Sequence, residues 1–226
     1  MVQTIKHLGH TLSCCLDFYK DVILKKGSFI GCVNDVLTEF AFAHPHVKCK
    51  LVQIYGTCFY GSPLWDLYGI SAKSLYKTWN IAIRKLYDLP YRAHTRFLDN
   101  ISGASHLSIS LKMRFIKFVN KLLSSENILI NNLINVSLCD NMSPTGLNLS
   151  RILSEFDMYS SCYFNLYGND AQSMILNSYN VVHKLSSQEL SICHTITELI
   201  NCVHGTFTNV LSVKQCKELI SVLSTD

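Results

Sequence analysis

The stretch from residue 72 to residue 89 constrains the fold most strongly, because its apolar and basic side chains follow the same helical spacing. One stripe consists of Leu75, Trp79, Ala82, Leu86 and Leu89. A second stripe consists of Lys73, Lys77, Asn80 and Arg84. The stripes are offset by two residues, about 200° around an α-helix, so one face can pack while the opposite face presents cations. Pro90 disfavours helical geometry at the residue before it, and the helix is therefore expected to stop at Leu89.

Apolar residues at helical spacing predict that most of the chain is α-helical. Residues 17–43 show such a pattern, with an expected buried face of Ile23, Ile30, Val33, Leu37 and Phe40. The helix expected from Val47 has the pattern Val47, Leu51, Ile54 and Cys58. The helix expected over 105–123 has the pattern Leu107, Leu111, Phe115, Phe118 and Leu122. Further helices are expected at 126–138, 147–157, 170–185, 188–204 and 213–223.

Helix ends and breaks also have sequence signals. Ser186-x-x-Glu189 and Ser212-x-x-Gln215 match the capping box of a helix start, and Gly205 is placed to end the helix before it. Residues 1–13 are expected to form a short strand or hairpin around Gly9, and the Ser-Pro-Thr-Gly run at 143–146 is the best candidate domain boundary. The prediction is a mainly α protein with a short N-terminal β hairpin and a second helical bundle after Ser143.

The basic residues are concentrated in the middle of the chain. Residues 1–72 carry six Lys/Arg and five Asp/Glu, a net charge of +1. Residues 73–121 carry ten Lys/Arg and two Asp/Glu, a net charge of +8. Residues 122–226 carry four Lys/Arg and nine Asp/Glu, a net charge of −5. A cationic segment focused in this way indicates a polyanionic partner.

Other functions lack their sequence signals. No segment approaches the ~18–20 apolar residues of a membrane span, and the N-terminus has no apolar core of a secretory signal. Ten scattered cysteines favour free thiols in a reducing compartment over a disulfide framework. Cys193, Cys202, His204 and Cys216 come nearest to a zinc cluster, but their spacing fits no common structural site. No phosphate-cradling glycine loop or nucleophile elbow is present, so catalysis by this chain alone is not expected.

The cationic segment is the positive functional signal. Lys and Arg on one helix face can neutralise phosphates, and aromatic residues interleave with them, namely Tyr76, Trp79, Tyr87, Tyr91 and Phe97. The alternative is a solvated helix face with aromatic residues in the core, and for Trp79 and Tyr87 core packing is the better expectation. An extended stretch after Pro90 would place Arg92, His94 and Arg96 on one side.

Three segments of the chain recur in an order that one protein family shares. They read YGTCFYGSPLWDL (55–67), YKTWNIAIRKLYDLPYRAHTRFL (76–98) and MRFIKFVNKLLSSEN (113–127). In this order they resemble the region after the polymerase palm of non-LTR, LINE-type retrotransposon reverse transcriptases, whose usual YRTH turn reads Tyr91-Arg92-Ala93-His94 here. KHLGHTL (6–12) resembles the primer-grip hairpin of these enzymes, and FIGCVNDVLTEF (29–40) resembles the start of their thumb. The resemblance covers roughly residues 5–130, and the remainder matches only in position.

The resemblance implies four consecutive segments. They are a primer-grip-like hairpin at 1–13, thumb-like helices at 14–68, a basic helical post-thumb segment at 69–142 and a C-terminal helical tail domain at 143–226. The implied primer-grip residues are His7, Leu8 and Gly9. The implied nucleic-acid contacts are Lys73, Lys77, Arg84, Lys85, Arg92, His94, Arg96, Arg114, Lys117 and Lys121.

The family's metal-binding aspartates lie N-terminal to the HLGH segment, so the chain is expected to be a C-terminal fragment without the fingers and most of the palm. The parent would be an RNA-directed DNA polymerase that uses Mg²⁺. This fragment would hold no cofactor or metal and would contribute only primer–template contacts. Its expected partners are RNA or RNA–DNA duplex and the missing palm and fingers, with no membrane, in the nucleus or cytoplasm of the cell. The alternatives are a helical protein-interaction module, whose 73–121 cations pair with acidic C-terminal helices, and a decayed fragment without function.

Overall fold

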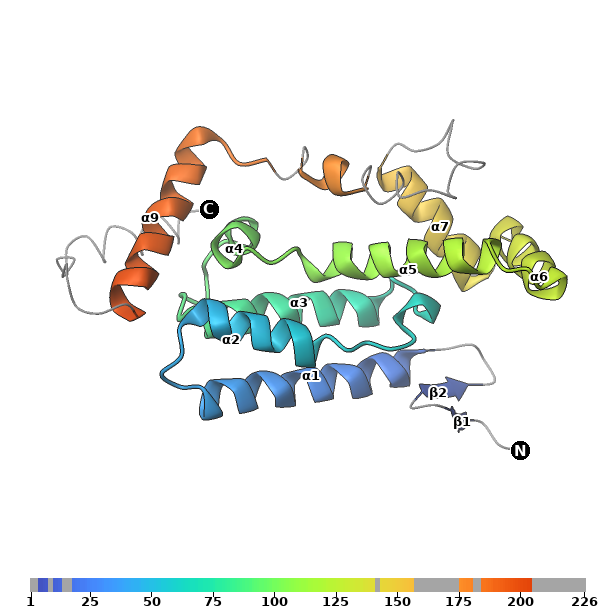
Figure 1. Ribbon diagram of the computed structural model, residues 1–226, viewed down its shortest axis with the longest axis horizontal. Helices are drawn as coiled ribbons and strands as arrows, with labels where there is room; N and C mark the ends of the chain where they lie inside the picture. Colours follow the sequence, from blue (N-terminus) through green and yellow to red (C-terminus); the bar gives the residue numbers. More distant parts are fainter. Residues whose placement is uncertain are drawn as a thin grey trace. The chain divides into compact units, whose positions relative to one another are not determined.

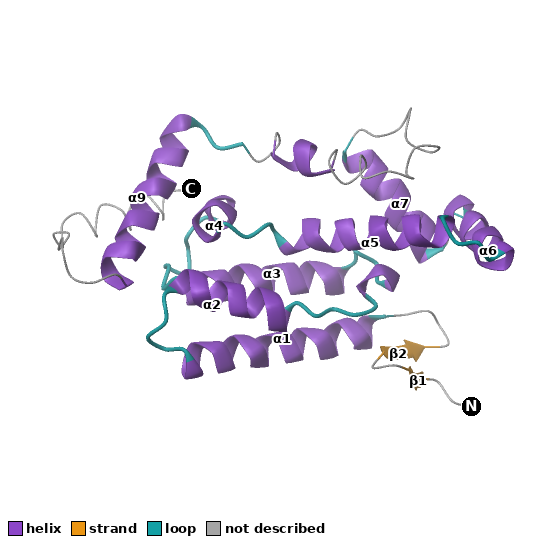
Figure 2. Ribbon diagram, viewed as in Figure 1, coloured by secondary structure: helices purple, strands orange, loops and turns teal. Residues whose placement is uncertain are grey.

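Helices make up most of the described chain, which confirms the prediction of a mainly α protein (Figure 1, Figure 2). The structure, a computed structural model, describes residues 4–7, 10–13, 18–140, 143–156, 175–180 and 184–204. In chain order the elements are β1 (Thr4–His7), β2 (His10–Ser13), α1 (Tyr19–Glu39), α2 (Pro45–Leu51), the π-helix η1 (Val52–Gly56), the 3-10 helix η2 (Ser62–Leu64), α3 (Ile70–Leu86), α4 (Thr95–Ser102), α5 (Leu107–Leu123), α6 (Ile128–Cys139), α7 (Pro144–Glu155) and α9 (Ser187–His204).

Near the N-terminus, β1 and β2 pair antiparallel, with Thr4 opposite Ser13 and His7 opposite His10. Leu8 and Gly9 of the expected primer grip lie outside the described residues, and only the backbone of His7 is described. Gly205 and the expected helix over 213–223 with its capping box also lie outside them.

The chain divides into two compact units, each built from separated stretches of sequence. The first unit contains residues 1–24, 59–75 and 106–184, and the second contains residues 25–58, 76–105 and 185–226. The units therefore do not coincide with the four consecutive segments expected from the sequence. Ser143 lies within the first unit, where its hydroxyl caps α7 by accepting from the Gly146 N–H, and Pro144 occupies the first helical position.

In the first unit, α5 packs against η2 and α6, and α7 also packs against both of these elements. Leu107, Leu111 and Phe115 of α5 are buried as expected. Phe118 and Leu122 are only half-buried, and Val119 and Leu123 are buried in the last turns instead. This correction follows from the two contacts of α5, because a helix covered by two neighbours buries a wider face than a single stripe.

In the second unit, the buried face of α1 differs from the prediction. Of the expected face, Val33 is buried and Leu37 half-buried, whereas Ile30 is 41% exposed and Phe40 is exposed. The buried residues are Phe29, Val33 and Val36, and the first-unit end of α1 likewise buries Val22 and exposes Ile23. The buried face of α1 is shifted by about one residue from the predicted face. The reason is that the Phe29 ring packs against the Trp79 ring of α3, with 5.9 Å between the ring centroids.

The predicted face of the next helix is also wrong. Val47 and Cys58 are exposed and Ile54 is 63% exposed, whereas Lys48, Cys49, Val52 and Gly56 are buried. The α-helix ends after two turns at Leu51 and continues as the π-helix η1, whose wider turn changes the side-chain period. Lys48 can be buried because its aliphatic stem is apolar and its Nζ donates to the Ala41 carbonyl oxygen at 2.8 Å.

The helix α3 ends three residues before the expected stop at Leu89. The Leu89 N–H donates to the Arg84 carbonyl oxygen at 2.8 Å, and the Asp88 N–H donates to the Lys85 carbonyl oxygen at 3.4 Å. Asp88 has a φ of 51°, so these contacts form a Schellman motif with aspartate where glycine is usual. The helix end is thus made by backbone hydrogen bonds before Pro90 is reached.

Three helices of the described chain start with a histidine cap. His44, His94 and His106 precede α2, α4 and α5, and each Nδ1 accepts from the backbone N–H two residues later, at 3.2 to 3.3 Å. This bond replaces the intrahelical partner that the first turn lacks. The acceptor role places the proton on Nε2, which agrees with the 3.0 Å contact between His44 Nε2 and the Asn201 Oδ1 of α9.

Candidate nucleic-acid interface

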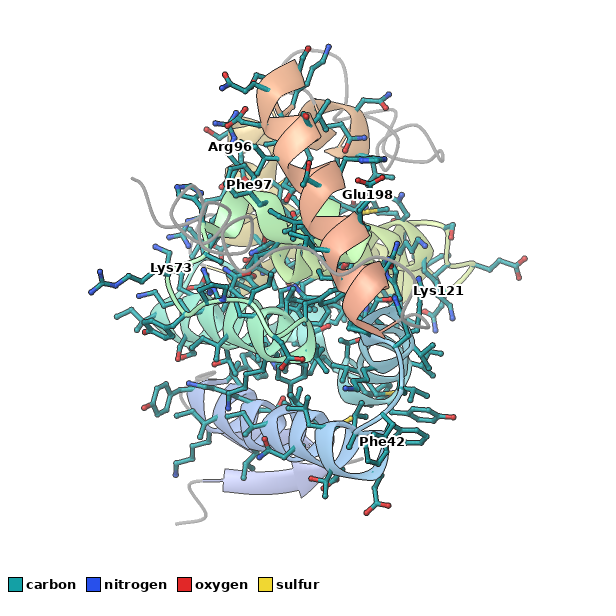
Figure 3. The ribbon with its side chains drawn as sticks, turned by 90° about the vertical axis from the view of Figure 1, so that its left-hand side faces the viewer. Phe42, Lys73, Arg96, Phe97, Lys121 and Glu198 are labelled. Atoms are coloured by element: carbon teal, nitrogen blue, oxygen red, sulfur yellow. The ribbon has the colours of Figure 1, made fainter. Side chains whose placement is uncertain are left out.

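The first turns of α3 present two lysines to solvent. Lys73 and Lys77 are exposed and lie about one helical turn apart, with Lys73 projecting from the ribbon (Figure 3). The opposite face of these turns is buried through Leu75 and Trp79, which confirms the predicted two faces for this part of the helix. Farther along, Asn80 and Arg84 of the predicted solvent face are half-buried. Neither lysine forms an ion pair with a carboxylate in the part of the chain that the structure describes.

Arg84 differs from the outward orientation expected for it. Its Nε and Nη2 both donate to the Ala93 carbonyl oxygen, at 2.9 and 2.7 Å. The side chain is half-buried, and this burial lowers the pKa of the guanidinium. Arg84 therefore braces the turn that follows α3, while Lys85 beside it is exposed.

The residues after Pro90 do not form the expected extended stretch. Arg92 is exposed in a turn, His94 is the N-cap of α4, and Arg96 lies in the first turn of that helix. The prediction that they share one side is wrong, because the His94 imidazole accepts from the Arg96 N–H at 3.2 Å and so starts a helix. In an extended strand these three residues, which are two apart, would all point to one side, whereas a turn followed by a helix gives them different directions.

Arg96 is engaged by the C-terminal part of the second unit. Its Nη1 lies 2.9 Å from the Glu189 Oε1 of α9, and α4 and α9 pack together. The predicted capping box is confirmed, since Glu189 Oε2 accepts from the Ser186 N–H at 2.7 Å and Ser186 Oγ accepts from the Glu189 N–H at 3.3 Å. The Arg96–Glu189 ion pair is the kind of contact that the protein-interaction alternative expects, in which cations of residues 73–121 pair with acidic C-terminal helices.

A second cationic surface lies on α5 in the first unit. Arg114, Lys117 and Lys121 are three and four residues apart and so share a helix face. Lys117 and Lys121 are exposed, while Arg114 is half-buried. Lys121 is labelled in Figure 3. The opposite face of α5 is buried through Leu111 and Phe115, which directs the lysines outward.

Six of the predicted contacts remain open to a polyanion: Lys73, Lys77, Lys85, Arg92, Lys117 and Lys121. All six are exposed, and none has a carboxylate partner within the described ranges. They lie on α3, on the turn after it and on α5. Each can meet a phosphate without first breaking an ion pair among these residues.

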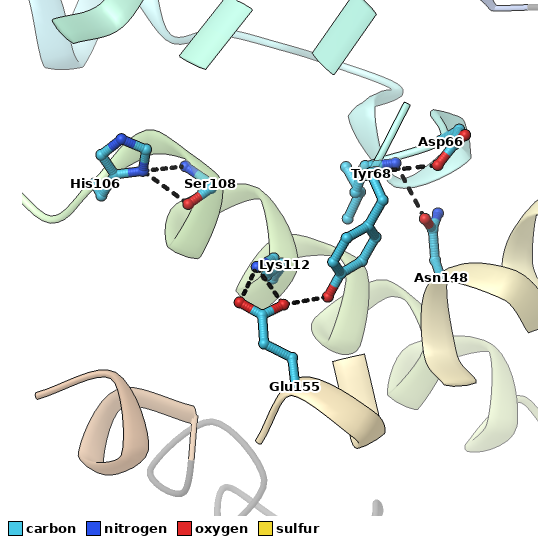
Figure 4. A network of polar contacts seen from close by, with 8 residues as sticks. Asp66, Tyr68, His106, Ser108, Lys112, Asn148 and Glu155 are labelled. Atoms are coloured by element: carbon cyan, nitrogen blue, oxygen red, sulfur yellow. Dashed lines mark hydrogen bonds and ion pairs between the residues drawn. The ribbon is translucent and has the colours of Figure 1, made fainter. Parts of the chain in front are cut away.

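The first unit holds a polar network around the buried Lys112 that the sequence does not predict (Figure 4). Lys112 is 5% exposed on α5, and its Nζ lies 2.7 and 2.6 Å from the Glu155 carboxylate oxygens of α7. The Tyr68 hydroxyl donates to Glu155 at 2.5 Å, and the Lys112 ammonium lies 4.9 Å from the centre of the Tyr68 ring. Lys112 is thus a structural cation within the basic segment.

Asn148 of α7 holds the loop that follows η2. Its side chain is fully buried, and its Oδ1 accepts from the Leu67 N–H at 3.0 Å (Figure 4). Its Nδ2 donates to the Trp65 carbonyl oxygen at 2.7 Å. The Trp65 indole in turn donates to the buried Asp21 carboxylate of α1 at 2.9 Å. The signal in the sequence is only a polar residue between Leu147 and Leu149, which is too weak to predict these partners.

The buried cysteines of the second unit are poor nucleophiles. Burial raises the pKa of the Cys49 thiol to about 11 and that of the Cys193 thiol to about 11. Burial also raises the pKa of Tyr87, whose hydroxyl lies 2.8 Å from the His46 Nδ1. Trp79 and Tyr87 are both core residues, as expected. These groups stabilise the core and offer no reactive thiolate.

Groups that would mark a metal site or a membrane span are absent from the described residues. There, no three His, Cys, Asp or Glu side chains are grouped so that they could hold a metal ion. No helix in the described part of the chain is both long and apolar enough to cross a membrane. Comparisons with protein-family models, with curated proteins and with solved structures give no match.

Proposed function

We propose that this chain binds nucleic acid through the phosphate backbone, as the primer-grip, thumb and post-thumb region of a LINE-type reverse transcriptase. Nucleotidyl transfer with Mg²⁺ belongs to the palm of such an enzyme, and this chain contributes primer–template contacts. The proposed ligand is an RNA–DNA or RNA duplex, so the protein is proposed to act in the nucleus or cytoplasm. The β1–β2 hairpin is the primer-grip-like element in this proposal.

The proposed binding rests on the six exposed cations that have no carboxylate partner among the described residues. Counterion release by lysine and arginine supplies most sequence-independent binding to nucleic acid, and it requires cations that are free to approach phosphates. Lys73 and Lys77 meet this condition on α3, and Lys117 and Lys121 meet it on α5. Arg84 and Arg96 have internal partners and take a smaller part.

The experiment measures binding of the 226-residue chain to a labelled RNA–DNA duplex by fluorescence anisotropy over a series of salt concentrations. Binding should weaken linearly on a log–log plot and should be equal for duplexes of unrelated sequence. The double variant Lys73→Gln/Lys77→Gln should reduce the slope by about two, since each lost phosphate contact reduces it by about one.

The matched control is Lys20→Gln/Lys50→Gln, which removes two exposed charges outside the 73–121 segment. It changes the net charge equally and should leave most of the slope in place. Binding that is absent, or that does not respond to salt, would contradict the proposal. An equal loss of slope in the two double variants would show that only net charge matters.

A further inference from the structure

A groove lies at the C-terminal end of α3, wholly within the second unit. Its volume is about 560 Å³, and it is lined by Leu37, Ile81, Arg84, Lys85, Asp88, Leu89 and Tyr91. Sites for small molecules are commonly about 300–1,000 Å³. The lining comes from α1, from α3 and from the turn that the Schellman motif creates.

The groove has an apolar wall and an exposed aromatic ring. Leu37 and Leu89 are half-buried, and Ile81 is 38% exposed. Tyr91 is 79% exposed, and it forms no hydrogen bond or ring contact with the other described residues. The face of this solvent-exposed ring, which lies beside aliphatic side chains, is available for stacking with another planar group.

The charges of the groove favour an anion. Lys85 is exposed and has no carboxylate partner in the described ranges. Arg84 donates to Ala93 from Nε and Nη2, which leaves its Nη1 without a hydrogen bond among the described residues. Asp88 opposes these two cations with a single negative charge.

We propose that this groove holds one unpaired nucleotide, with its base stacked on Tyr91 and its phosphate at Lys85. The inference rests on the proposed binding of nucleic acid and adds a preference for a single-stranded extension. Bases inside a duplex are covered by their neighbours, so only an unpaired base can offer its face to Tyr91. Stacking on an exposed aromatic residue tolerates any base and adds affinity without sequence readout.

The test compares a blunt RNA–DNA duplex with the same duplex carrying a five-nucleotide single-stranded extension, both bound to the full chain. The extension should tighten binding about fivefold or more, as one stacked base can supply. An extension of abasic nucleotides keeps the phosphates and should lose this gain. Tyr91→Ala should also lose it, whereas Tyr91→Trp should retain it.

Two charge variants complete the design. Lys85→Gln should weaken binding to the extended duplex more than binding to the blunt one, and Asp88→Asn should strengthen it. Asparagine tolerates the positive φ of position 88, so the helix end is kept. Thermal unfolding should match the wild type for Tyr91→Ala, because this side chain lies outside the core.

The outcomes separate the two proposals. Salt-dependent binding with equal affinity for blunt and extended duplexes would overturn the groove inference and leave the proposed function standing. Absence of binding to both would overturn both. Tyr91-dependent binding of a helical Glu/Leu peptide, without any preference for the extension, would assign the groove to a protein partner and overturn the inference.

Discussion

Arg84 shows at the residue scale how a cation on a basic helix face can serve the fold. Its two bonds to the Ala93 carbonyl join positions nine residues apart and hold the turn between α3 and α4. The planar guanidinium can make both bonds at once, which a lysine ammonium on its flexible stem cannot reproduce with the same geometry. The charge pattern alone places Arg84 and Lys77 on the same helix face, but Arg84 binds the Ala93 carbonyl whereas Lys77 is exposed to solvent.

Arg84→Gln should lower the free energy of unfolding by about 1–3 kcal/mol, because hydrogen bonds from a charged donor are lost and the Ala93 carbonyl is left without its partner. Urea unfolding followed by circular dichroism measures this loss. The adjacent Lys85→Gln removes the same charge from an exposed position and should change stability by no more than about 0.5 kcal/mol. Equal stability of the two variants would contradict the bracing role.

At the element scale, the start of α9 combines a capping box with an ion pair. The Ser186 N–H and hydroxyl, with smaller contributions from Arg96 and His94, lower the pKa of the Glu189 carboxyl. The carboxylate also lies at the N-terminal end of a helix, where a negative charge is favourable. The ion pair between α4 and α9 therefore requires the ionised form of the Glu189 side chain.

A lowered folded-state pKa means that Glu189 stabilises the protein above its ordinary pKa of about 4.3 and that this stability is lost as the pH falls through the folded value. The variant Glu189→Gln keeps a side chain that suits the capping box but removes the charge. The melting temperature of the wild type should exceed that of Glu189→Gln at pH 7, and the difference should shrink as the pH falls below about 4. Thermal unfolding across a pH series measures the difference.

Glu198→Gln is the matched control, because Glu198 lies on the same helix with a mostly exposed side chain and only a 3.5 Å contact to His194. Its difference from the wild type should be small at every pH. A Glu189→Gln difference that stays constant from pH 7 to pH 3 would contradict the role of the charge.

At the scale of the whole molecule, contacts between distant parts of the sequence complete each unit. In the first unit, Asn148 and Glu155 of α7 reach the loop at 65–68, across 81 and 87 residues of sequence. The loop belongs to the segment 55–68, whereas α7 follows Ser143, the position expected from the sequence to be a domain boundary. The C-terminal part is thus a component of the fold of that segment.

Asn148→Leu should lower the free energy of unfolding by about 2 kcal/mol or more, because the buried Leu67 N–H and Trp65 carbonyl would both lose their partner. The midpoint of urea unfolding measures the loss. Asn132→Ala on α6 alters an exposed asparagine and should stay within about 0.5 kcal/mol of the wild type. A midpoint that Asn148→Leu leaves unchanged would show that α7 does not hold the loop.

The sequence by itself determined the helical character, the approximate bounds of α5, α6 and α9, the capping box at Ser186 and the outward position of Lys73 and Lys77. These features depend on residues within about one to three turns of each other, so a local pattern contains the necessary information.

Only the tertiary structure decided which face of α1 and of α2 is buried, where Arg84 binds, and that Lys112 and Asn148 lie inside. Both α1 and α2 carry apolar side chains on more than one face, so the sequence pattern alone permits several orientations. The choice is made by partners far away in the sequence, such as Trp79 against Phe29 and the Trp65 loop against Asn148. Close packing stabilises all of these contacts together, so the sequence of one helix alone does not contain the information that selects its buried face.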